Sequence, residues 1–210
     1  MTQKLNGAYS YFLLVLVTLT GSVLQAQTAT KETSKNSLYM DVHYLPAGTV
    51  KFSDVAAAHA KDLAVQEKHN THFIKYWVDE SKGVVYCLSS APDTMSIQNT
   101  HREAHGLMPQ AIYKIEDGVE ATSKINNTYF LDVHELGAHS VKAADVEKAH
   151  QKELAVQKKY GVNFINYWVD EQKGTVFCLS QASDASKVVQ THKEAHGLIP
   201  LHITEVKQGQ

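Results

Sequence analysis

The sequence is poor in cysteine, in net charge and in long apolar runs, and each shortage narrows what the protein can be. Its formal net charge is −2, and Lys and Arg are scattered among Asp and Glu, so nucleic acid is not expected as a partner. The apolar run at residues 11–17 is too short to span a membrane. The two cysteines, Cys87 and Cys178, lie in apolar runs and are expected to be buried thiols, although an exported protein also permits a disulfide.

Sequence motifs of several enzyme classes are also missing. There is no G-x-S-x-G element for a nucleophilic serine and no glycine-rich loop for phosphate. The segments H-R-E-A-H and H-K-E-A-H differ from the zinc-protease motif H-E-x-x-H, because their acid occupies a different place in the helical turn. These absences argue against serine hydrolases, phosphate-loop enzymes and zinc proteases of that type.

The N-terminal segment is typical of an export signal. Residues 1–26 hold Lys4, then the apolar run, then small residues up to Ala26. No cysteine follows the expected cleavage point, so a lipid anchor is not expected, and residues 27–37 form a polar tail that we expect to be disordered. We therefore expect a periplasmic or secreted protein whose mature form has no membrane span. An uncleaved anchor is the alternative.

The rest of the chain is a tandem duplication. THREAHGLMP at Thr100–Pro109 returns as THKEAHGLIP at Thr191–Pro200, and the same shift of 91 positions aligns the repeats without an insertion. The repeats cover residues 38–116 and 129–206, joined by a polar linker at 117–128. Each repeat is near the lower size limit for a domain with a sufficient core, so we expect each copy to cover the other.

Hydrophobic periodicity and turn residues predict the order βαββαβ in each repeat. The order is the ferredoxin-like split βαβ unit, in which two helices cover one face of a four-stranded sheet. In repeat 1 we expect a strand at 38–45, a helix capped by Ser53 or Asp54, hairpin strands at 73–79 and 84–89, a helix from Asp93 to Gly106 and a strand at 111–115.

The two helices of each repeat cover only one face of its sheet, so the apolar side chains of the other face must pack against another surface. If Tyr39, Phe73 and Trp77 occupied it, the bare face would be an unusually large apolar patch. We therefore expect an α+β fold in which the two repeats pack sheet to sheet, as an intrachain pseudo-dimeric α+β barrel.

Eight of the twelve histidines occupy equivalent positions in the two repeats and are the candidates for a shared function. The other four are not matched between the copies. The eight candidate metal ligands are His43, His59, His101 and His105 in repeat 1, and His134, His150, His192 and His196 in repeat 2.

His101 and His105, with His192 and His196, are the first candidates among the eight. They are four residues apart on one helix, so their imidazoles project from the same face and can converge on one ion. The alternative is that a histidine in the last helical turn only interacts with the helix dipole and the terminal carbonyl groups.

Oxygen donors accompany these histidines in the sequence. Asp41 beside His43, Asp62 (Glu153 in repeat 2) near His59, and Glu103 (Glu194) between the paired histidines can serve as ligands or orient an imidazole.

Strand alternation limits how these residues can combine. We expect Met40 and Val42 to face the helices, which would turn Asp41 and His43 into the barrel interior. Two smaller sites per repeat are then easier to build than one site with four histidines. Core histidines bonded to backbone carbonyls are the alternative without a metal.

An imidazole-rich site with carboxylates suits nickel, copper or zinc better than calcium or magnesium. Because an imidazole must be neutral to bind an ion, we expect affinity to fall as pH drops through the histidine range.

Long segments of both repeats resemble a known bacterial family. They are DVAAAHAKDLAVQEKH, FIKYWVDESKGVVYCLSSAPD and THREAHGLMP, with the partners DVEKAHQKELAVQKKY, FINYWVDEQKGTVFCLSQASD and THKEAHGLIP. They resemble the small nickel-binding (nickel-responsive) proteins with a ferredoxin-like fold, classed as a domain of unknown function. The resemblance implies two such domains in tandem, paired as an α+β barrel, and nickel as the first ion to test. It implies no catalytic activity.

The leading hypothesis is an exported, non-catalytic protein that binds a divalent metal ion, with one or more histidine-rich sites per repeat and possible further self-association. A second hypothesis is a monooxygenase-type enzyme, in which Trp77, His43 and Asp41 line a cavity between the sheets. Asp79 lies on the same strand face as Trp77 and could line a small-ligand cavity, but a role in the hairpin is expected for it. A third is a structural or small-ligand-binding module of the cell envelope, in which the histidines only contribute to packing.

Overall fold

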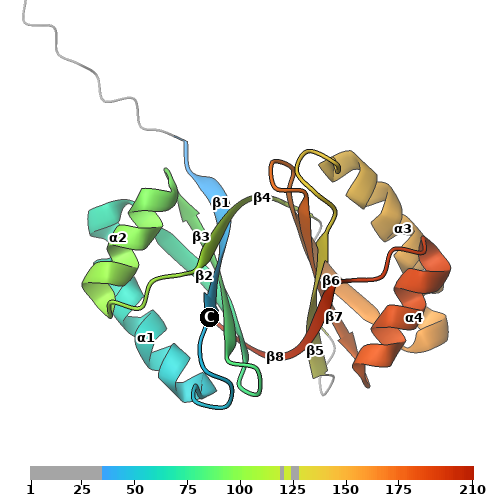
Figure 1. Cartoon of the computed structure of the whole chain (residues 1–210), viewed down its shortest axis with the longest axis horizontal. Coiled ribbons are helices and arrows are strands. Elements are labelled where there is room, and N and C mark those ends of the chain that lie inside the picture. Colours follow the sequence, from blue (N-terminus) through green and yellow to red (C-terminus); the bar gives the residue numbers. More distant parts are fainter. Residues whose placement is uncertain (1–34, 119–120, 124–127) are drawn as a thin grey trace, which may run out of the picture. The chain divides into compact units, whose positions relative to one another are not determined.

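Each repeat has the βαββαβ order that its sequence pattern predicts (Figure 1). The computed structural model describes residues 35–118, 121–123 and 128–210. Repeat 1 consists of β1 (Ser37–Tyr44), α1 (Phe52–Val65), the 3₁₀ helix η1 (Gln66–His69), β2 (His72–Asp79), β3 (Val84–Ala91), α2 (Thr94–Ala104) and β4 (Ala111–Asp117). Repeat 2 consists of β5 (Thr128–Glu135), α3 (Ala143–Tyr160), β6 (Asn163–Asp170), β7 (Thr175–Ala182), α4 (Ala185–Ala195) and β8 (His202–Gly209).

The expected signal segment at 1–26 lies outside the described residues, as does most of the expected tail. The tail was predicted to reach residue 37, but Ser37 already belongs to β1. Among the described helices, none has the length and apolar character that crossing a membrane requires.

The helix boundaries follow from local capping. Asp93 caps α2 as predicted, because its Oδ1 accepts a hydrogen bond from the backbone N–H of Ser96 at 2.8 Å. Gly106, with φ of 78°, follows the end of α2 in a left-handed conformation. The cap of α1 differs from the prediction: the helix begins at Phe52, and the Asp54 carboxylate accepts from the backbone N–H of Lys51 at 3.0 Å.

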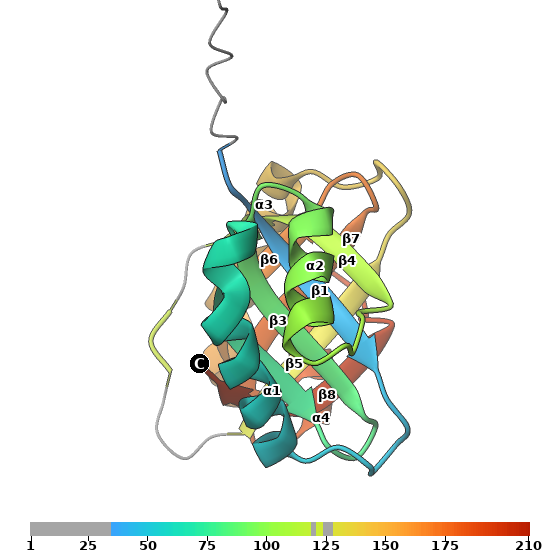
Figure 2. The same ribbon diagram turned by 90° about the vertical axis from the view of Figure 1, so that its left-hand side faces the viewer.

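The eight strands close into one barrel, which confirms the predicted pairing of the repeats within the chain. The strand order is β1-β3-β2-β8-β5-β7-β6-β4. Within each repeat the neighbours are those of a ferredoxin-like sheet, and the last strand of each repeat pairs with the other repeat: β4 with β6, and β8 with β2. Figures 1 and 2 show α1 and α2 on the outer face of one half and α3 and α4 on the other.

The barrel interior is an apolar core shared by both repeats. Met40, Val42 and Trp77 pack there with their partners from repeat 2, and the Trp77 and Trp168 ring centroids are 5.1 Å apart. The expectation that Tyr39 and Phe73 also face the other sheet is wrong, since both pack under α1 and α2. Residues of even number along β1 therefore face the barrel, and residues of odd number face the helices.

The shared core should dominate stability. Met40 is 0% exposed and Met95 on α2 is 56% exposed. Met40→Ala is expected to lower the free energy of unfolding by about 2–5 kcal/mol, because it opens a cavity between the sheets. Met95→Ala, the matched control, should change it by less than about 0.5 kcal/mol. Urea denaturation measures both, and equal effects would show that the barrel interior is not the main core.

Candidate metal centre

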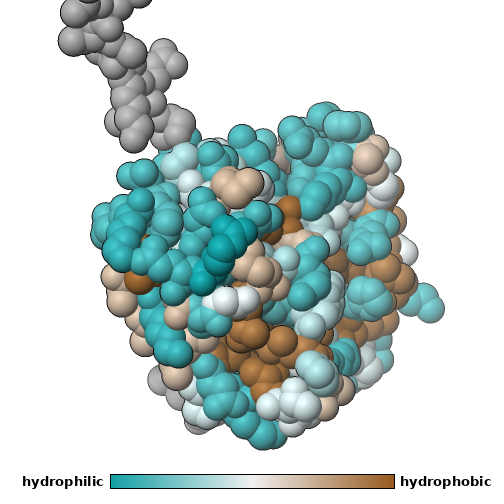
Figure 3. All heavy atoms as spheres, turned by 60° about the vertical axis from the view of Figure 1, so that its left-hand side comes forward, coloured by the Kyte–Doolittle hydropathy of each residue, from teal (hydrophilic) through white to brown (hydrophobic). Residues whose placement is uncertain are grey.

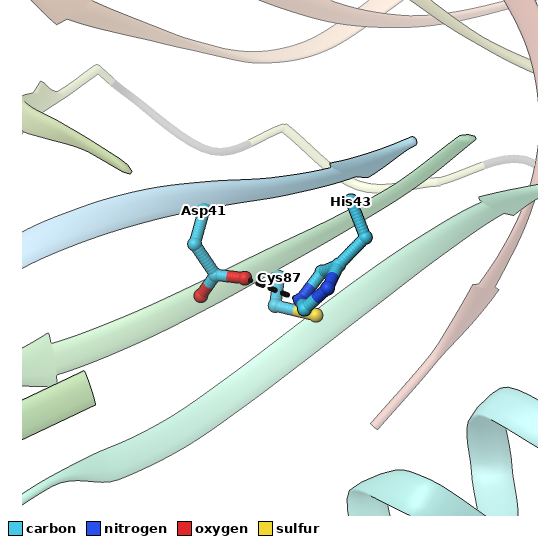
Figure 4. A group of neighbouring side chains, drawn as sticks. All are labelled: Asp41, His43 and Cys87. Atoms are coloured by element: carbon cyan, nitrogen blue, oxygen red, sulfur yellow. Dashed lines mark hydrogen bonds and ion pairs between the residues drawn. The ribbon is translucent and has the colours of Figure 1, made fainter. Parts of the chain in front are cut away.

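Alternation along β1 brings Asp41 and His43 to the helix side of the sheet. The prediction that they face the barrel interior, with Met40 and Val42 toward the helices, is therefore wrong. Asp41 is 0% exposed, and its Oδ1 lies 3.0 Å from Nε2 of His43. Figure 4 shows both side chains directed to the same side as Cys87, which lies opposite Asp41 on β3. The two residues can therefore meet the histidines of α2.

The last turn of α2 brings His101 and His105 together, as their spacing predicts. His101 Nδ1 and His105 Nε2 are 3.2 Å apart. Asp62 on α1 faces both rings, with 3.1 Å from its Oδ1 to His101 Nδ1 and 3.2 Å from its Oδ2 to His105 Nε2. The backbone N–H of Leu107 donates to His105 Nδ1 at 3.1 Å, so in the metal-free protein the proton of a neutral His105 ring lies on Nε2, which donates to Asp62.

His101 lies between two buried carboxylates. Its second nitrogen, Nε2, lies 3.5 Å from Asp41 Oδ1. Burial would lower the pKa of His101, but the hydrogen bond between Nδ1 and Asp62 and the charges of Asp41 and Asp62 outweigh it and raise the pKa to about 9. Burial would raise the pKa of both carboxyl groups, yet the neighbouring imidazoles hold each below its ordinary value. At neutral pH the metal-free centre therefore contains a protonated imidazole between two carboxylates.

His43 and Cys87 form the inner edge of the cluster. The His43 ring meets the His101 ring edge to face, with centroids 5.1 Å apart. Cys87 is a free, buried thiol, as is Cys178 in repeat 2. Burial and the charge of Asp41 raise the pKa of Cys87 well above its usual value, so the sulfur stays protonated in the metal-free protein.

His59 lies in the same pocket but packs on aromatic rings. Its ring centroid is 4.8 Å from that of Tyr76 and 6.2 Å from that of Phe73. Burial lowers the pKa of His59, so its ring is neutral near pH 7. His43, His59, His101 and His105 line one pocket. The donor atoms that lie close enough together to share an ion nevertheless fall into two groups, Asp41 with His43 and Cys87, and Asp62 with His101 and His105.

Repeat 2 builds the same cluster with a longer acid. Glu153 Oε1 lies 2.7 Å from His192 Nδ1 and 2.8 Å from His196 Nε2, and Oε2 lies 3.1 Å from His150 Nδ1. Burial would lower the pKa of His192, but Asp132 and Glu153 raise it to about 10. Burial would raise the pKa of Glu153, but hydrogen bonds from the three imidazoles hold it well below its ordinary value.

His134, the fourth imidazole of the repeat 2 cluster, lies against Asp132 on the same strand, β5. His134 Nε2 is 3.2 Å from Asp132 Oδ1, but the two are not aligned as a hydrogen bond. The His134 and His192 rings meet edge to face with centroids 5.0 Å apart, as in repeat 1.

One further sequence-based assignment is not met. Glu103 and Glu194 do not face the paired histidines; on the outer surface Glu103 binds Lys68 and His69, and Glu194 binds Lys159 and Tyr160. Asp79 has the expected role in the hairpin, where its Oδ1 accepts from the backbone N–H groups of Ser81 and Lys82.

An apolar pocket opens over each cluster. In repeat 1 its walls include Leu45, Val50, Val55 and Leu107, and in repeat 2 the equivalent positions have the same character. Figure 3 shows this side of the molecule, where an apolar patch interrupts a mostly hydrophilic surface. The polar groups of each cluster therefore lie at the base of a pocket with apolar walls, where charge interactions are stronger than in water.

The geometry of the donors fits a transition-metal ion. In repeat 1 the inner nitrogens of His101 and His105 and the Asp62 carboxylate form a triangle with sides of 3.1–3.2 Å. Neighbouring donors around an ion with bonds of about 2.1 Å are separated by roughly 3.0–3.4 Å. Asp41 Oδ2 and His101 Nε2 are buried and have no hydrogen-bond partner in the described part of the chain. A nitrogen-rich set with carboxylates suits nickel, copper or zinc.

Sequence reasoning identified the imidazoles but missed Cys87 as a neighbour of the cluster. The signal was available: both cysteines occupy equivalent positions, and each lies on the strand that pairs with the Asp-x-His strand of its repeat.

Comparisons with known proteins agree with the duplicated architecture. The profile described as nickel responsive protein SCO4226-like matches residues 39–115 and 130–206. The crystal structure of SCO4226 from Streptomyces coelicolor A3(2) is 36% identical over 39% of this chain and 99% of that chain, with a TM-score of 0.37. A mutant chlorite dismutase from Candidatus Nitrospira defluvii is 6% identical over 84% of this chain and 93% of that chain, with a TM-score of 0.48. A comparison with curated proteins gave no match.

The buried imidazolium should give the metal-free protein a distinct pH dependence. Because the folded pKa of His101 is about 9 against an ordinary 6.5, its proton stabilises the fold fully below pH 6.5. That contribution is lost as pH rises through about 9, at roughly 1.4 kcal/mol per pH unit in between. Urea denaturation at pH 6 and pH 9 should show the loss, and NMR should show His101 and His192 titrating above pH 8. Titration of both rings near pH 6.5 would contradict the paired arrangement.

Proposed function

The chain belongs to the nickel responsive protein SCO4226-like family, and from this premise we propose that it is an exported, non-catalytic protein that binds a divalent transition-metal ion at one site in each repeat. Nickel is the first ion to test, because the family description names it. The observation that carries the proposal is the triangle of His101, His105 and Asp62, which recurs as His192, His196 and Glu153.

Residues from three secondary-structure elements surround each site, and these elements would hold a bound ion in a fixed position. The α2 helix contributes two imidazoles one turn apart, α1 contributes the carboxylate, and β1 contributes Asp41 and His43 beneath them. Asp41 orients both His43 and His101 from the sheet side. We assign His101, His105 and Asp62 as the ligands, with Asp41 and His43 on the other edge of the His101 ring, where Asp41 lies against Nε2 and helps to orient that ring.

Charge balance supports a cation in this position. The cluster of repeat 1 contains two buried carboxylates, Asp41 and Asp62, whose charge is offset in the metal-free protein by the His101 proton. A divalent ion at the triangle supplies the positive charge that the proton supplies now, so binding releases a proton from the imidazoles. Affinity should therefore rise with pH up to about 9, which extends the histidine range expected from the sequence.

Export is the second part of the proposal and rests on residues 1–26 alone. The protein recovered from the cell envelope of its own organism should begin near Gln27, because the apolar run and the small residues before Gln27 resemble a cleaved signal. N-terminal sequencing and intact mass measure this. Recovery of the uncleaved chain from the cytosol would contradict export and leave the metal sites unaffected.

The number of bound ions tests the metal sites. Calorimetric titration of metal-free protein with nickel should give two ions per chain. The double variant His101→Ala/His105→Ala should bind one ion, as should His192→Ala/His196→Ala, and the combination should bind none, since each pair provides most of the nitrogen donors of its site. Each double variant retains the other site as an internal control for folding.

Two further titrations complete this experiment. His69→Ala/His72→Ala removes two histidines that are not matched between the repeats, and it should still bind two ions. Repeating the wild-type titration at pH 6, 7.5 and 9 should show affinity that increases with pH. Equal weak binding by wild type and all variants, or affinity independent of pH, would sink the proposal.

A further inference from the structure

A second cavity lies inside one end of the barrel, on the opposite face of the sheets from the metal clusters. Its volume is about 220 Å³, enough for several water molecules, and residues of both repeats line it. Four of them are aromatic and come from four strands: Tyr44 on β1, Tyr86 on β3, Tyr113 on β4 and Phe177 on β7. We refer to it below as the barrel-end chamber.

The walls of the barrel-end chamber have diverged between the repeats, unlike the metal clusters. In the alignment of the two repeats, Tyr44 corresponds to Glu135, Tyr86 to Phe177 and Tyr113 to Thr204. All six residues line the chamber. A dimer of identical subunits would repeat each wall residue across the twofold axis. In a single chain the two repeats need not contribute the same residues. Here repeat 1 contributes three tyrosines to the chamber, and the aligned positions of repeat 2 contribute a glutamate, a phenylalanine and a threonine.

The aromatic rings stand at steep angles to one another, as the walls of a box. The Phe177 ring is inclined by 77° to the Tyr113 ring and by 73° to the Tyr86 ring, with centroids 5.0 Å and 6.3 Å apart. Tyr86 and Phe177 are buried, whereas Tyr44 is 57% exposed. The chamber therefore has a deep aromatic wall, with Tyr44 at its more exposed side.

The groups with a charge or an ionisable ring that line the barrel-end chamber are Glu135, Lys82 and His202. The Glu135 carboxylate lies close enough to Tyr44 and Tyr113 to raise the pKa of both phenols, after the effect of burial. The Lys82 ammonium also lines the chamber, but it donates to the Ile203 carbonyl at 2.8 Å and to Thr204 Oγ1 at 2.9 Å, so β8 already binds it. The Lys173 ammonium, which is not among the groups that line the chamber, lies 4.1 Å from the Tyr113 ring centroid and donates to the Ile112 carbonyl, so this ring accepts a cation.

We propose that the barrel-end chamber binds a small organic cation with a quaternary ammonium head group, held against Tyr44, Tyr86, Tyr113 and Phe177 with Glu135 as its counter-charge. Aromatic rings that surround a methylated ammonium bind it through cation–π attraction, and a nearby carboxylate adds to that attraction. The proposal is independent of the metal sites, which lie on the other face of the sheets.

Choline is the probe for this site. Calorimetric titration of the metal-free full chain should show one choline per chain. The uncharged analogue with carbon in place of the ammonium nitrogen should bind at least about tenfold more weakly, because it keeps the shape and loses the charge. Glycine betaine adds a carboxylate to the same head group and should bind more weakly than choline, because Glu135 repels that carboxylate and β8 already binds Lys82. Tighter binding of glycine betaine would contradict Glu135 as the counter-charge.

Variants locate the binding. Glu135→Gln and Tyr44→Leu should each weaken choline binding by about tenfold, and both positions are exposed enough to tolerate the change. Glu194→Gln makes the same charge change on the outer surface and should leave it unaltered, as should His101→Ala/His105→Ala. No choline binding, equal binding of the uncharged analogue, or an equal effect of Glu194→Gln would overturn the proposal.

Discussion

Side-chain alternation along β1 and β5 is the constraint on which the rest of the structure depends. On one side of the sheet it directs Met40, Val42 and their counterparts into a shared apolar core. On the other it places Asp41 and His43 under the helices, where they meet His101. A shift of one residue in the pairing of β1 with β3 would exchange these sets, burying a carboxylate between the sheets and leaving the cluster without its base. One register thus positions both the core and the candidate metal centre.

The buried cluster is costly for a fold of this size. A carboxylate removed from water loses several kcal/mol of hydration, and replacing a buried ionic group with apolar residues is often neutral or stabilising. The chain nevertheless keeps Asp41, His101 and an acid at position 62 in one repeat and their equivalents in the other. This retention in two copies, beside core positions such as Met40 and Leu131 that do differ, favours a role in binding over a role in packing.

The duplication places two kinds of feature in one chain, a cluster within each repeat and a cavity between the repeats. The metal clusters lie within the separate repeats and have kept nearly the same residues, apart from Asp62 against Glu153. The barrel-end chamber lies between the repeats, and there Tyr44, Tyr86 and Tyr113 align with Glu135, Phe177 and Thr204. The two repeats therefore contribute different side chains to the cavity that they share.

Much of this architecture could be predicted from the sequence, because the strongest signals are local or repeated. The 91-residue shift, the Asp93 cap and the Gly106 stop fixed the element order, and the spacing of His101 and His105 fixed their shared helix face. The sequence could not show which side of β1 faces the helices. Asp41 and His43 are the polar residues of an alternating strand, and polar residues normally point away from the side that the helices cover. Only the tertiary pairing of Asp41 with His101 and of Asp62 with both imidazoles overrides that pattern. Glu103 was expected near the metal because it lies between His101 and His105 in the sequence. Residues two apart on a helix do not share a face, so Glu103 lies on the outer side of α2 and binds Lys68.

X-ray absorption spectroscopy of the nickel-loaded protein tests the central claim most directly. The account predicts a first shell of nitrogen and oxygen donors, the multiple-scattering pattern of about two imidazoles per ion and no short nickel–sulfur distance, because the assigned ligands are His101, His105 and Asp62, with His192, His196 and Glu153 in repeat 2, and neither set includes a cysteine. A shell of water oxygens without imidazole scattering, or one dominated by sulfur, would contradict it.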